Sequence, residues 1–170
     1  SSRAGYTTDC SRVEIAKRAV KSVLDADNNG TVTTSDYDAL NMRMGYMRFY
    51  DCGSDTGTDY NANCNRLINP IFTPYDTIWS SISAAGATGG THLASSLKEA
   101  KLYLDNHKSV DNAKACRKKF VILISDGEDT LACSGSGSES QSDQYKRRRE
   151  TIARARALSN AGYKVFVVGF

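Results

Sequence analysis

The sequence predicts an α/β fold built on a largely parallel sheet, and three observations lead to this expectation. Two continuous apolar runs, at 118–125 and 163–170, have the composition of strands that are buried on both faces of a parallel sheet. Segments with helical periodicity alternate with the strand-like runs along the chain. The chain has 170 residues, of which 40% are hydrophobic, and this is enough for one domain with a substantial core.

Each expected element has a local signal. The helix at 11–24 places its apolar side chains on one face, and Ser11 and Glu14 have the spacing of a capping box. The helix at 145–161 ends at Gly162, a residue type that favours helix C-termini. In chain order the expected elements are helices at 11–24 and 34–40, a strand at 42–49, helices at 75–85 and 91–106, a strand at 118–125, a helix at 145–161 and a strand at 163–170.

Composition and charge exclude several classes of protein. The net charge of +3 is too small to indicate nucleic-acid binding, and no apolar run approaches the roughly 20 residues that cross a bilayer. Five cysteines, with no C-x-x-C pair among them, argue against structural zinc. No nucleophile–base pair accompanies Glu128 and Asp129, so we do not expect an enzyme.

The chain opens at Ser1 without a methionine, so we expect it to be a piece of a longer protein.

The cysteines indicate an oxidising compartment. Cys52 and Cys64 bracket a loop at 51–66 that is rich in Gly, Asp and Asn and has almost nothing to bury. A disulfide between them would order this loop, which is a pattern of secreted proteins. The alternative is that the five cysteines are unrelated buried thiols in a reducing compartment.

The other cysteines are separated by a strand. Cys116 precedes the strand at 118–125 and Cys133 follows it, so that they lie roughly 26 Å apart, too far for a disulfide. Cys10 precedes a helix that starts at the same edge of the sheet as Cys133. We therefore expect a Cys10–Cys133 disulfide and an unpaired Cys116.

The twelve residues from Asp25 to Asp36 have the pattern of a calcium-binding loop. Calcium binds six to eight oxygens, and this loop offers side-chain oxygens at its first, third and fifth positions. Gly30 at the sixth position permits a sharp turn, and the apolar Val32 at the eighth position anchors the loop. The expected ligands are Asp25, Asp27, Asn29, the backbone carbonyl of Thr31, Thr33 directly or through water, and Asp36.

The surroundings of this loop support the same interpretation. A helix precedes it and a short helix follows it, as a calcium loop requires, whereas the alternative is a chance Asx/Gly turn. Asp36 stands at the twelfth position, where an EF-hand usually has glutamate, and this resembles the dockerin-type loops of secreted proteins. A single unpaired loop has no partner for the opening motion of a sensor. We therefore expect a structural Ca²⁺.

A second metal site is expected where the helix at 91–106 begins and the strand at 118–125 ends. A glycine pair precedes Thr91 and aims its hydroxyl over the edge of the sheet, and Asp126 follows the carboxyl end of its strand. In open α/β sheets, ligands bind at this edge. The two side chains would offer one neutral and one charged oxygen to a divalent cation.

In this order and spacing, four segments resemble the von Willebrand factor A domain family. The resemblance implies a doubly wound, mostly parallel sheet flanked by helices. It also implies a single domain over 1–170, with the calcium loop at 25–36 as an insertion. The segments are MRMGYMRF at 42–49, GATGGTHLASSLKEA at 86–100, KKFVILISDGED at 118–129 and RARALSNAGYKVFVVGF at 154–170.

The resemblance also implies a metal-ion-dependent adhesion site. In that family the site uses a D-x-S-x-S segment, a threonine and an aspartate, and Thr91 and Asp126 match the last two. The ion would be Mg²⁺ or Mn²⁺. The D-x-S-x-S segment lies on the first central strand, which is missing from this sequence; Ser1 or Ser2 would be its final serine, and the sequence leaves open which.

The calcium loop narrows the resemblance. Its place between the first helix and the next strand, followed by GYMRFYDC, is similar to the amino-terminal region of PilY-type adhesins at the tips of bacterial type IV pili. This implies a secreted, metal-dependent adhesion domain on the bacterial cell surface. Its partner would be a protein, either a pilus subunit or a receptor on a host or another surface. The alternative is a purely structural, calcium-stabilised module of a larger extracellular assembly.

Overall fold

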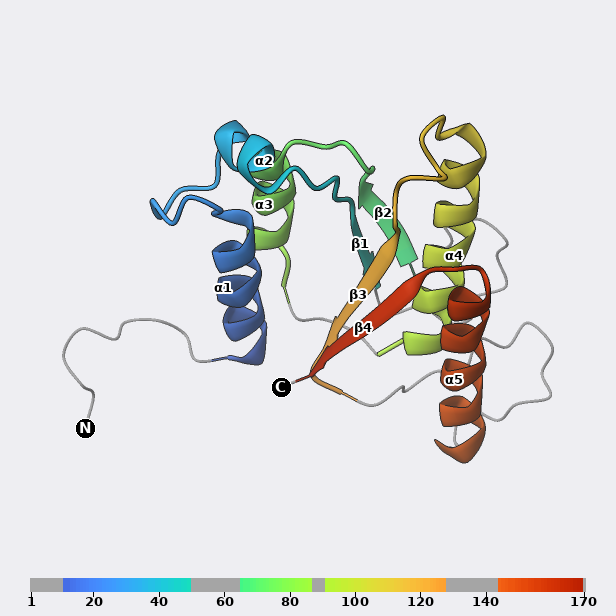
Figure 1. Ribbon diagram of the computed structural model, residues 1–170. Coiled ribbons are helices and arrows are strands. Elements are labelled where there is room, and N and C mark those ends of the chain that lie inside the picture. The colour runs from blue at the N-terminus through green and yellow to red at the C-terminus, as the bar shows by residue number, and fades with distance from the viewer. Residues whose placement is uncertain (1–10, 50–64, 87–90, 128–143, 170) are drawn as a thin grey trace, which may run out of the picture. The chain divides into compact units, whose positions relative to one another are not determined.

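The computed structural model describes residues 11–49, 65–86, 91–127 and 144–169 (Figure 1). They form a mixed α/β structure with five helices and two small sheets of two strands each. The chain divides into two compact units, which we describe separately. In chain order the elements are α1 (Arg12–Leu24), α2 (Thr34–Leu40), β1 (Tyr46–Phe49), β2 (Asn65–Asn69), α3 (Tyr75–Ser83), α4 (Leu93–Val110), β3 (Phe120–Ser125), α5 (Gln144–Asn160) and β4 (Lys164–Gly169).

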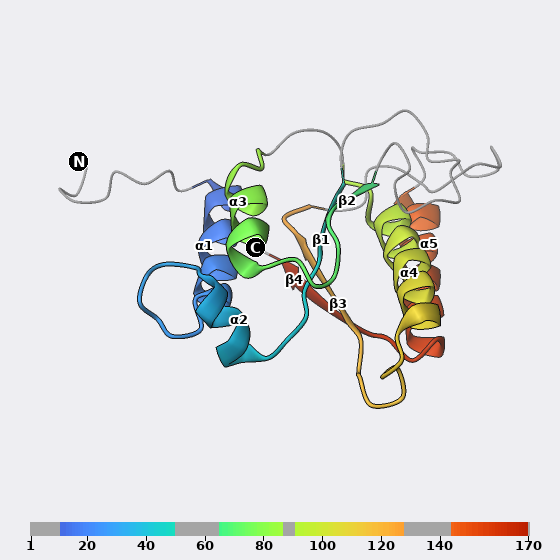
Figure 2. The same cartoon turned by 90° about the horizontal axis from the view of Figure 1, so that it is seen from above.

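The first unit contains the three helices α1, α2 and α3, and α3 packs against both of the others (Figure 2). Its core is a cluster of four buried side chains from three segments: Leu24, Val32, Tyr75 and Ile78. The Tyr75 hydroxyl donates a hydrogen bond of 2.7 Å to the carbonyl oxygen of Met42, so that the phenol is satisfied within the core. Because Val32 lies in the loop between α1 and α2, this core fixes the loop against α3.

The helices of the first unit lie close to their predicted positions, but one detail is wrong. Ser11 occupies the N-cap position of α1, yet its side chain makes no capping hydrogen bond. Glu14 accepts a hydrogen bond of 2.8 Å from Nζ of Lys17, one turn further along the helix. The predicted capping box at the start of α1 is therefore replaced by an ion pair within the helix.

The strand predicted at 42–49 is shorter than expected, and a second strand was missed. β1 begins only at Tyr46. The preceding residue, Gly45, passes close to the backbone of another segment, and a Cβ there would lie 2.9 Å from the carbonyl oxygen of Asn69. β1 pairs with β2, which begins inside the loop predicted at 51–66. β2 has only two adjacent apolar residues between polar ends, too few to show the period of a strand.

The second unit contains α4, α5, β3 and β4 (Figure 1). The two strands pair in parallel, with Phe120 opposite Lys164 and Ser125 opposite Gly169, which confirms the parallel pairing predicted from their apolar runs. α5 joins them and packs against α4 and β4. Buried apolar side chains come from α4, β3, α5 and the turn before β4: Ala94, Leu97, Leu104, Leu123, Leu158 and Tyr163.

The structure describes one of the five cysteines: Cys116 is exposed and forms no disulfide. Other expectations from the sequence concern residues outside the described ranges. The two expected disulfides, Cys52–Cys64 and Cys10–Cys133, involve residues beyond those that the structure describes, as do Ser1 and Ser2. Within the described ranges, none of the helices combines the length and apolar character that a bilayer-spanning helix needs.

Asp111 ties the loop before β3 to its neighbours. Its side chain is buried and accepts hydrogen bonds from Nη1 of Arg117 at 2.7 Å and from Nζ of Lys119 at 3.0 Å. The Lys119 ammonium is the main reason that the pKa of Asp111 is lowered from 3.8 to about 2, since burial alone would raise the pKa. The carboxylate is therefore ionised over the whole neutral and mildly acidic range.

This arrangement predicts a loss of stability in acid. Because the pKa of Asp111 is about 2 in the folded chain and 3.8 without its partners, the carboxylate stabilises the fold above its unfolded pKa. That contribution disappears as the pH falls through this interval. We expect Asp111→Asn to show a shallower fall in the free energy of unfolding between about pH 5 and 2, measured by urea titration. Asp76→Asn, at an exposed site on α3, is the control, and a profile equal to that of the Asp111 variant would contradict the prediction.

Candidate metal centre

The loop between α1 and α2 is closed by hydrogen bonds among its own residues. The N–H of Gly30 donates to Oδ2 of Asp25 at 2.9 Å, and the N–H of Asn29 donates to Oδ1 of Asp27 at 3.1 Å. The N–H of Thr31 donates to Oδ1 of Asn29 at 2.8 Å. Gly30 has a φ of +88°, a left-handed conformation that glycine adopts readily, as predicted for the sixth position of the loop.

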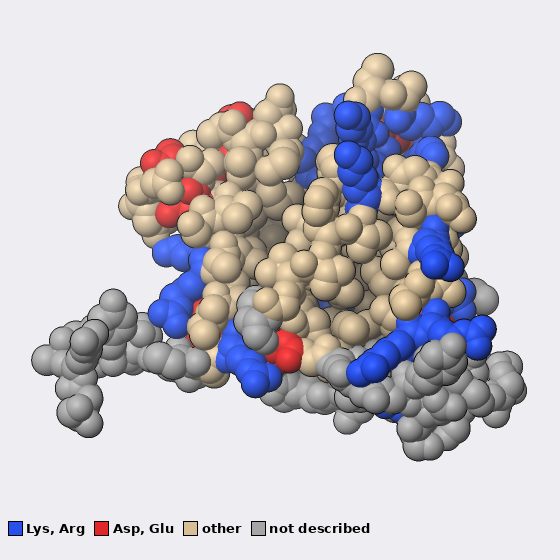
Figure 3. All heavy atoms as spheres, turned by 60° about the horizontal axis from the view of Figure 1, so that its bottom comes forward, with Lys and Arg blue, Asp and Glu red and all other residues tan. Residues whose placement is uncertain are grey.

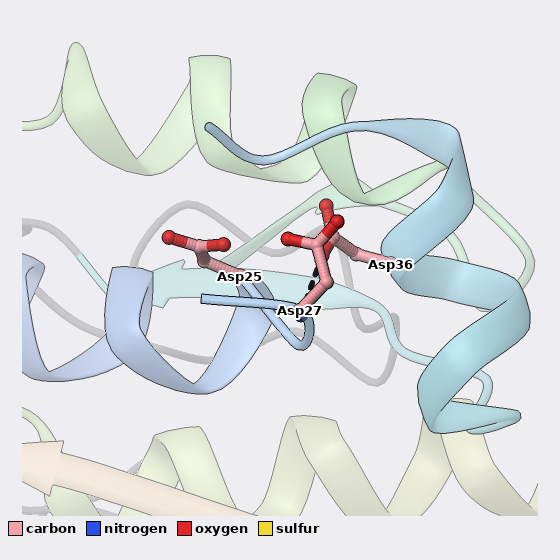
Figure 4. Close-up of side chains that lie close together, drawn as sticks. All are labelled: Asp25, Asp27 and Asp36. Atoms are coloured by element: carbon pink, nitrogen blue, oxygen red, sulfur yellow. Dashed lines mark hydrogen bonds between the residues drawn. The ribbon is translucent and has the colours of Figure 1, made fainter. Parts of the chain in front are cut away.

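Three carboxylates of this loop meet at one place. Asp25, Asp27 and Asp36 each offer an oxygen, and these oxygens all lie within 4.8 Å of one another (Figure 4). Calcium–oxygen distances of about 2.3–2.6 Å allow two ligands on opposite sides of an ion to be up to about 5 Å apart. The three oxygens are thus close enough to bind one cation together. Without a cation, three like charges at this spacing would repel one another.

Asp25 has a buried carboxylate oxygen that no hydrogen bond satisfies. It is the C-cap residue of α1 and is only 8% exposed. Oδ2 accepts the hydrogen bond from Gly30, but Oδ1 is buried and has no hydrogen-bond partner. A buried carboxylate oxygen without a partner costs free energy, and native structures rarely leave one. A bound cation would satisfy it.

Asp36 has a different role because its oxygens already have partners. The side chain is fully buried and accepts hydrogen bonds from the N–H groups of Thr33 at 2.7 Å, Ala26 at 2.7 Å and Asp27 at 3.3 Å. The Thr33 hydroxyl donates a fourth at 3.0 Å. The bond from the Thr33 N–H contributes most to holding the pKa of Asp36 below its usual value, so the group stays ionised.

These four hydrogen bonds join the two ends of the loop. Asp36 lies in the first turn of α2, where it forms a capping box with Thr33, and it also binds the backbone directly after α1. A carboxylate has about four acceptor positions. An ion that bound Asp36 directly would therefore replace at least one of these hydrogen bonds.

Not all of the predicted ligands lie at the meeting point of the carboxylates. The Asn29 amide donates a hydrogen bond of 2.7 Å to Oδ2 of Asp27, and its oxygen faces the Thr31 N–H. The Thr33 hydroxyl is 2.7 Å from Oγ of Ser35, besides its bond to Asp36. The geometry therefore brings three of the predicted side chains together as candidate ligands, whereas Thr33 serves the start of α2.

Sequence reasoning missed one residue of this site, Lys21. It lies one turn before Asp25 on α1, and its Nζ donates a hydrogen bond of 2.7 Å to the carbonyl oxygen of Gly30. Gly30 is thus held at its N–H by Asp25 and at its carbonyl by Lys21. The i, i+4 spacing of a lysine and the first loop aspartate was the available signal.

Two residues of the second predicted site, Thr91 and Asp126, lie within the second unit. Thr91 lies just before α4 and is half-buried, and Asp126 follows β3 and is exposed. A Cβ built on Gly127 would lie 3.2 Å from Oγ1 of Thr91. The Thr91 hydroxyl therefore lies beside the turn that carries Asp126, whereas Ser1 and Ser2 are outside the described residues.

Among the described residues, Asp25, Asp27 and Asp36 are the group of acidic, His or Cys side chains that could share one metal ion. All the atoms that they offer are carboxylate oxygens, which hard cations prefer. Comparison with family models, with curated proteins and with solved structures finds no match for this chain.

Proposed function

We propose that the chain is an extracellular domain stabilised by Ca²⁺ in the loop from Asp25 to Asp36. The observation that carries this proposal is Oδ1 of Asp25, which is buried, has no hydrogen-bond partner and belongs to a group of three carboxylates. All the side chains involved are oxygen donors, which suit a hard cation such as Ca²⁺. Because Leu24 and Val32 at the loop belong to the core of the first unit, the ion would brace that core.

Direct titration tests this proposal. The full chain, freed of metal, is titrated with CaCl₂ in a calorimeter, and we expect one ion to bind per chain. Asp25→Asn removes the charge at the buried position and should weaken binding by at least about tenfold, since a hard cation prefers charged oxygens. Asp38→Asn removes an equal charge from an exposed position on α2 and is the matched control. Equal affinities in the two variants would overturn the proposal.

As a second function we propose metal-dependent protein adhesion, in a doubly wound domain similar to von Willebrand factor A domains. Two observations favour it. β3 and β4 pair in parallel, and α5 lies between them in the sequence; the Thr91 hydroxyl lies beside the turn that carries Asp126. Mg²⁺ or Mn²⁺ would be held by Thr91, Asp126 and a serine, Ser1 or Ser2. A carboxylate of the partner, a pilus subunit or a surface receptor, would complete the coordination of the ion.

Variants separate adhesion from a purely structural role better than chelation does, because EDTA would remove both ions. We expect Thr91→Ala with Asp126→Ala to reduce adhesion of the full chain to purified type IV pili or cultured host cells by about tenfold or more, since two of the ligands are lost. The melting temperature and the calcium affinity should not change. Unchanged adhesion would leave only the calcium-stabilised module.

A further inference from the structure

A group of basic side chains surrounds the amino ends of β3 and β4. Three segments of the second unit contribute them: the end of α4, the loop at 111–119 and the first residue of β4. The N–H of Lys164 donates to the carbonyl oxygen of Lys119 at 3.2 Å, which places the last two segments side by side. We call these residues the basic loop surface: Lys108, Lys114, Arg117, Lys118, Lys119 and Lys164.

Much of this positive charge is not neutralised. Arg117 and Lys119 share Asp111, and Lys108 lies 5.6 Å from the centre of the Tyr163 ring. The next carboxylate along α4, Asp105, is bound by Lys101 and the Tyr163 hydroxyl. Three further lysines are exposed and take part in none of the ion pairs that the described residues form: Lys114, Lys118 and Lys164. Figure 3 shows Lys and Arg side chains gathered at this end of the second unit.

The loop of this surface is ordered by contacts of Asp111 that do not involve the side chains of the exposed lysines. Asp111 fixes Arg117 and Lys119, and its carbonyl oxygen accepts a hydrogen bond of 3.1 Å from the N–H of Lys114. The loop is thus ordered by one buried carboxylate, while the free ammonium groups project from it. A rigid loop with unpaired cations is suited to binding an anion, because little conformational entropy is lost on binding.

The basic loop surface is distant from the proposed adhesion site of the same unit. β3 starts beside this surface and ends just before Asp126 (Figure 1). Six residues of strand at about 3.3 Å each place the two ends roughly 20 Å apart. An anion bound at the basic end would therefore leave Thr91 and Asp126 accessible.

We propose that the basic loop surface binds a linear polysaccharide that carries sulfate groups. The cations lie on three segments that are neighbours in the folded unit. A flexible polyanion can pass from one segment to the next, whereas a planar bilayer contacts only the side chains that protrude most. The loop at 111–119 itself has no large apolar side chain that could enter a membrane, and the exposed apolar side chains directly beside it are Val110 and Phe120. Lysine ammonium groups act as point charges that attract sulfate without a fixed orientation.

Heparin is a suitable probe because it is a linear sulfated polysaccharide. Binding to the full chain is measured by calorimetry at several salt concentrations. The variant combines Lys114→Gln, Lys118→Gln and Lys164→Gln, and none of these residues forms an ion pair that the fold would lose. We expect the variant to bind heparin about tenfold more weakly at about 0.15 M salt. The slope of log affinity against log salt concentration should also be smaller in magnitude by about two, because fewer counterions are released on binding.

A second triple variant controls for net charge. Arg18→Gln, Arg148→Gln and Arg156→Gln remove the same charge from exposed positions on α1 and α5, and should retain heparin affinity within about twofold. Equal losses in the two variants would overturn the proposal. So would tighter binding of the wild type to vesicles of phosphatidylcholine and phosphatidylglycerol, or to duplex DNA, than to heparin. Affinity should be the same with Ca²⁺ or with EDTA, so failure of the calcium proposal would leave this result unaffected.

Discussion

Calcium is expected to raise the melting temperature of the chain by about 5–10 °C when the free ion is a hundredfold above its dissociation constant. An ion that binds only the folded state at this concentration stabilises it by about 2.7 kcal/mol. For a chain of this size each kcal/mol shifts the melting temperature by about 2–4 °C. The effect should appear first in the first unit, because the candidate site and the core cluster share the segment from Leu24 to Val32.

The single tryptophan of the chain can report this shift. Trp79 lies on α3 and packs against the core cluster of the first unit, so its fluorescence follows the unfolding of this unit. The expected result is a calcium-dependent shift in the wild type and in Asp38→Asn, with little or no shift in Asp25→Asn. A melting temperature that does not respond to calcium in the wild type would count against the site.

The second large effect is expected from Leu24→Ala. Leu24 is 1% exposed and directly precedes the first loop aspartate. Removal of a buried leucine side chain leaves a cavity and typically costs about 2–5 kcal/mol. Because Leu24 fixes the position of Asp25, calcium affinity should fall together with the free energy of unfolding, both measured with the Trp79 signal.

Val23→Ala is the matched control for this prediction. Val23 is the preceding residue of α1 but is 55% exposed. Its truncation should change the free energy of unfolding by less than about 0.5 kcal/mol and leave calcium affinity unchanged, as for most surface substitutions. A Leu24 variant that lost stability but bound calcium as tightly as the wild type would show that the core and the ion site are independent.

Local signals were sufficient to predict the helices and the parallel strands. The period of the apolar residues located α1 and α4 to within a few residues, because a helical face shows within a short window, and Gly162 marked the end of α5. The apolar runs at β3 and β4 predicted strands buried on both faces of a sheet. The two strands do pair in parallel, but the predicted burial is wrong for the described residues, because only Leu123 is buried while Ile122, Phe166 and Val167 are more than half exposed. β2 was missed because its pairing with β1 depends on a partner distant in sequence.

At the candidate site too, the residue spacing predicted some features, whereas others depend on segments that are distant in the sequence. The spacing of Asp25, Asp27 and Asp36 predicted a cation loop, and the structure brings these three carboxylates together. That the loop is an insertion in a single domain stays a prediction. The structure adds that Val32 packs with Tyr75 and Ile78 of α3, so that the loop contributes to the core of a compact helical unit.

The residues that can bind a cation, and the turn that orders them, could be predicted from local sequence, because the loop ligands and the glycine at the sixth position lie within twelve residues of one another. How each carboxylate is used depends on the folded chain. Oδ1 of Asp25 is buried and has no hydrogen-bond partner, whereas the backbone after α1 and at the start of α2 occupies the oxygens of Asp36. The physical reason is that burial and hydrogen bonding depend on segments that meet only in the folded chain, and these determine whether a carboxylate needs a cation or is already satisfied.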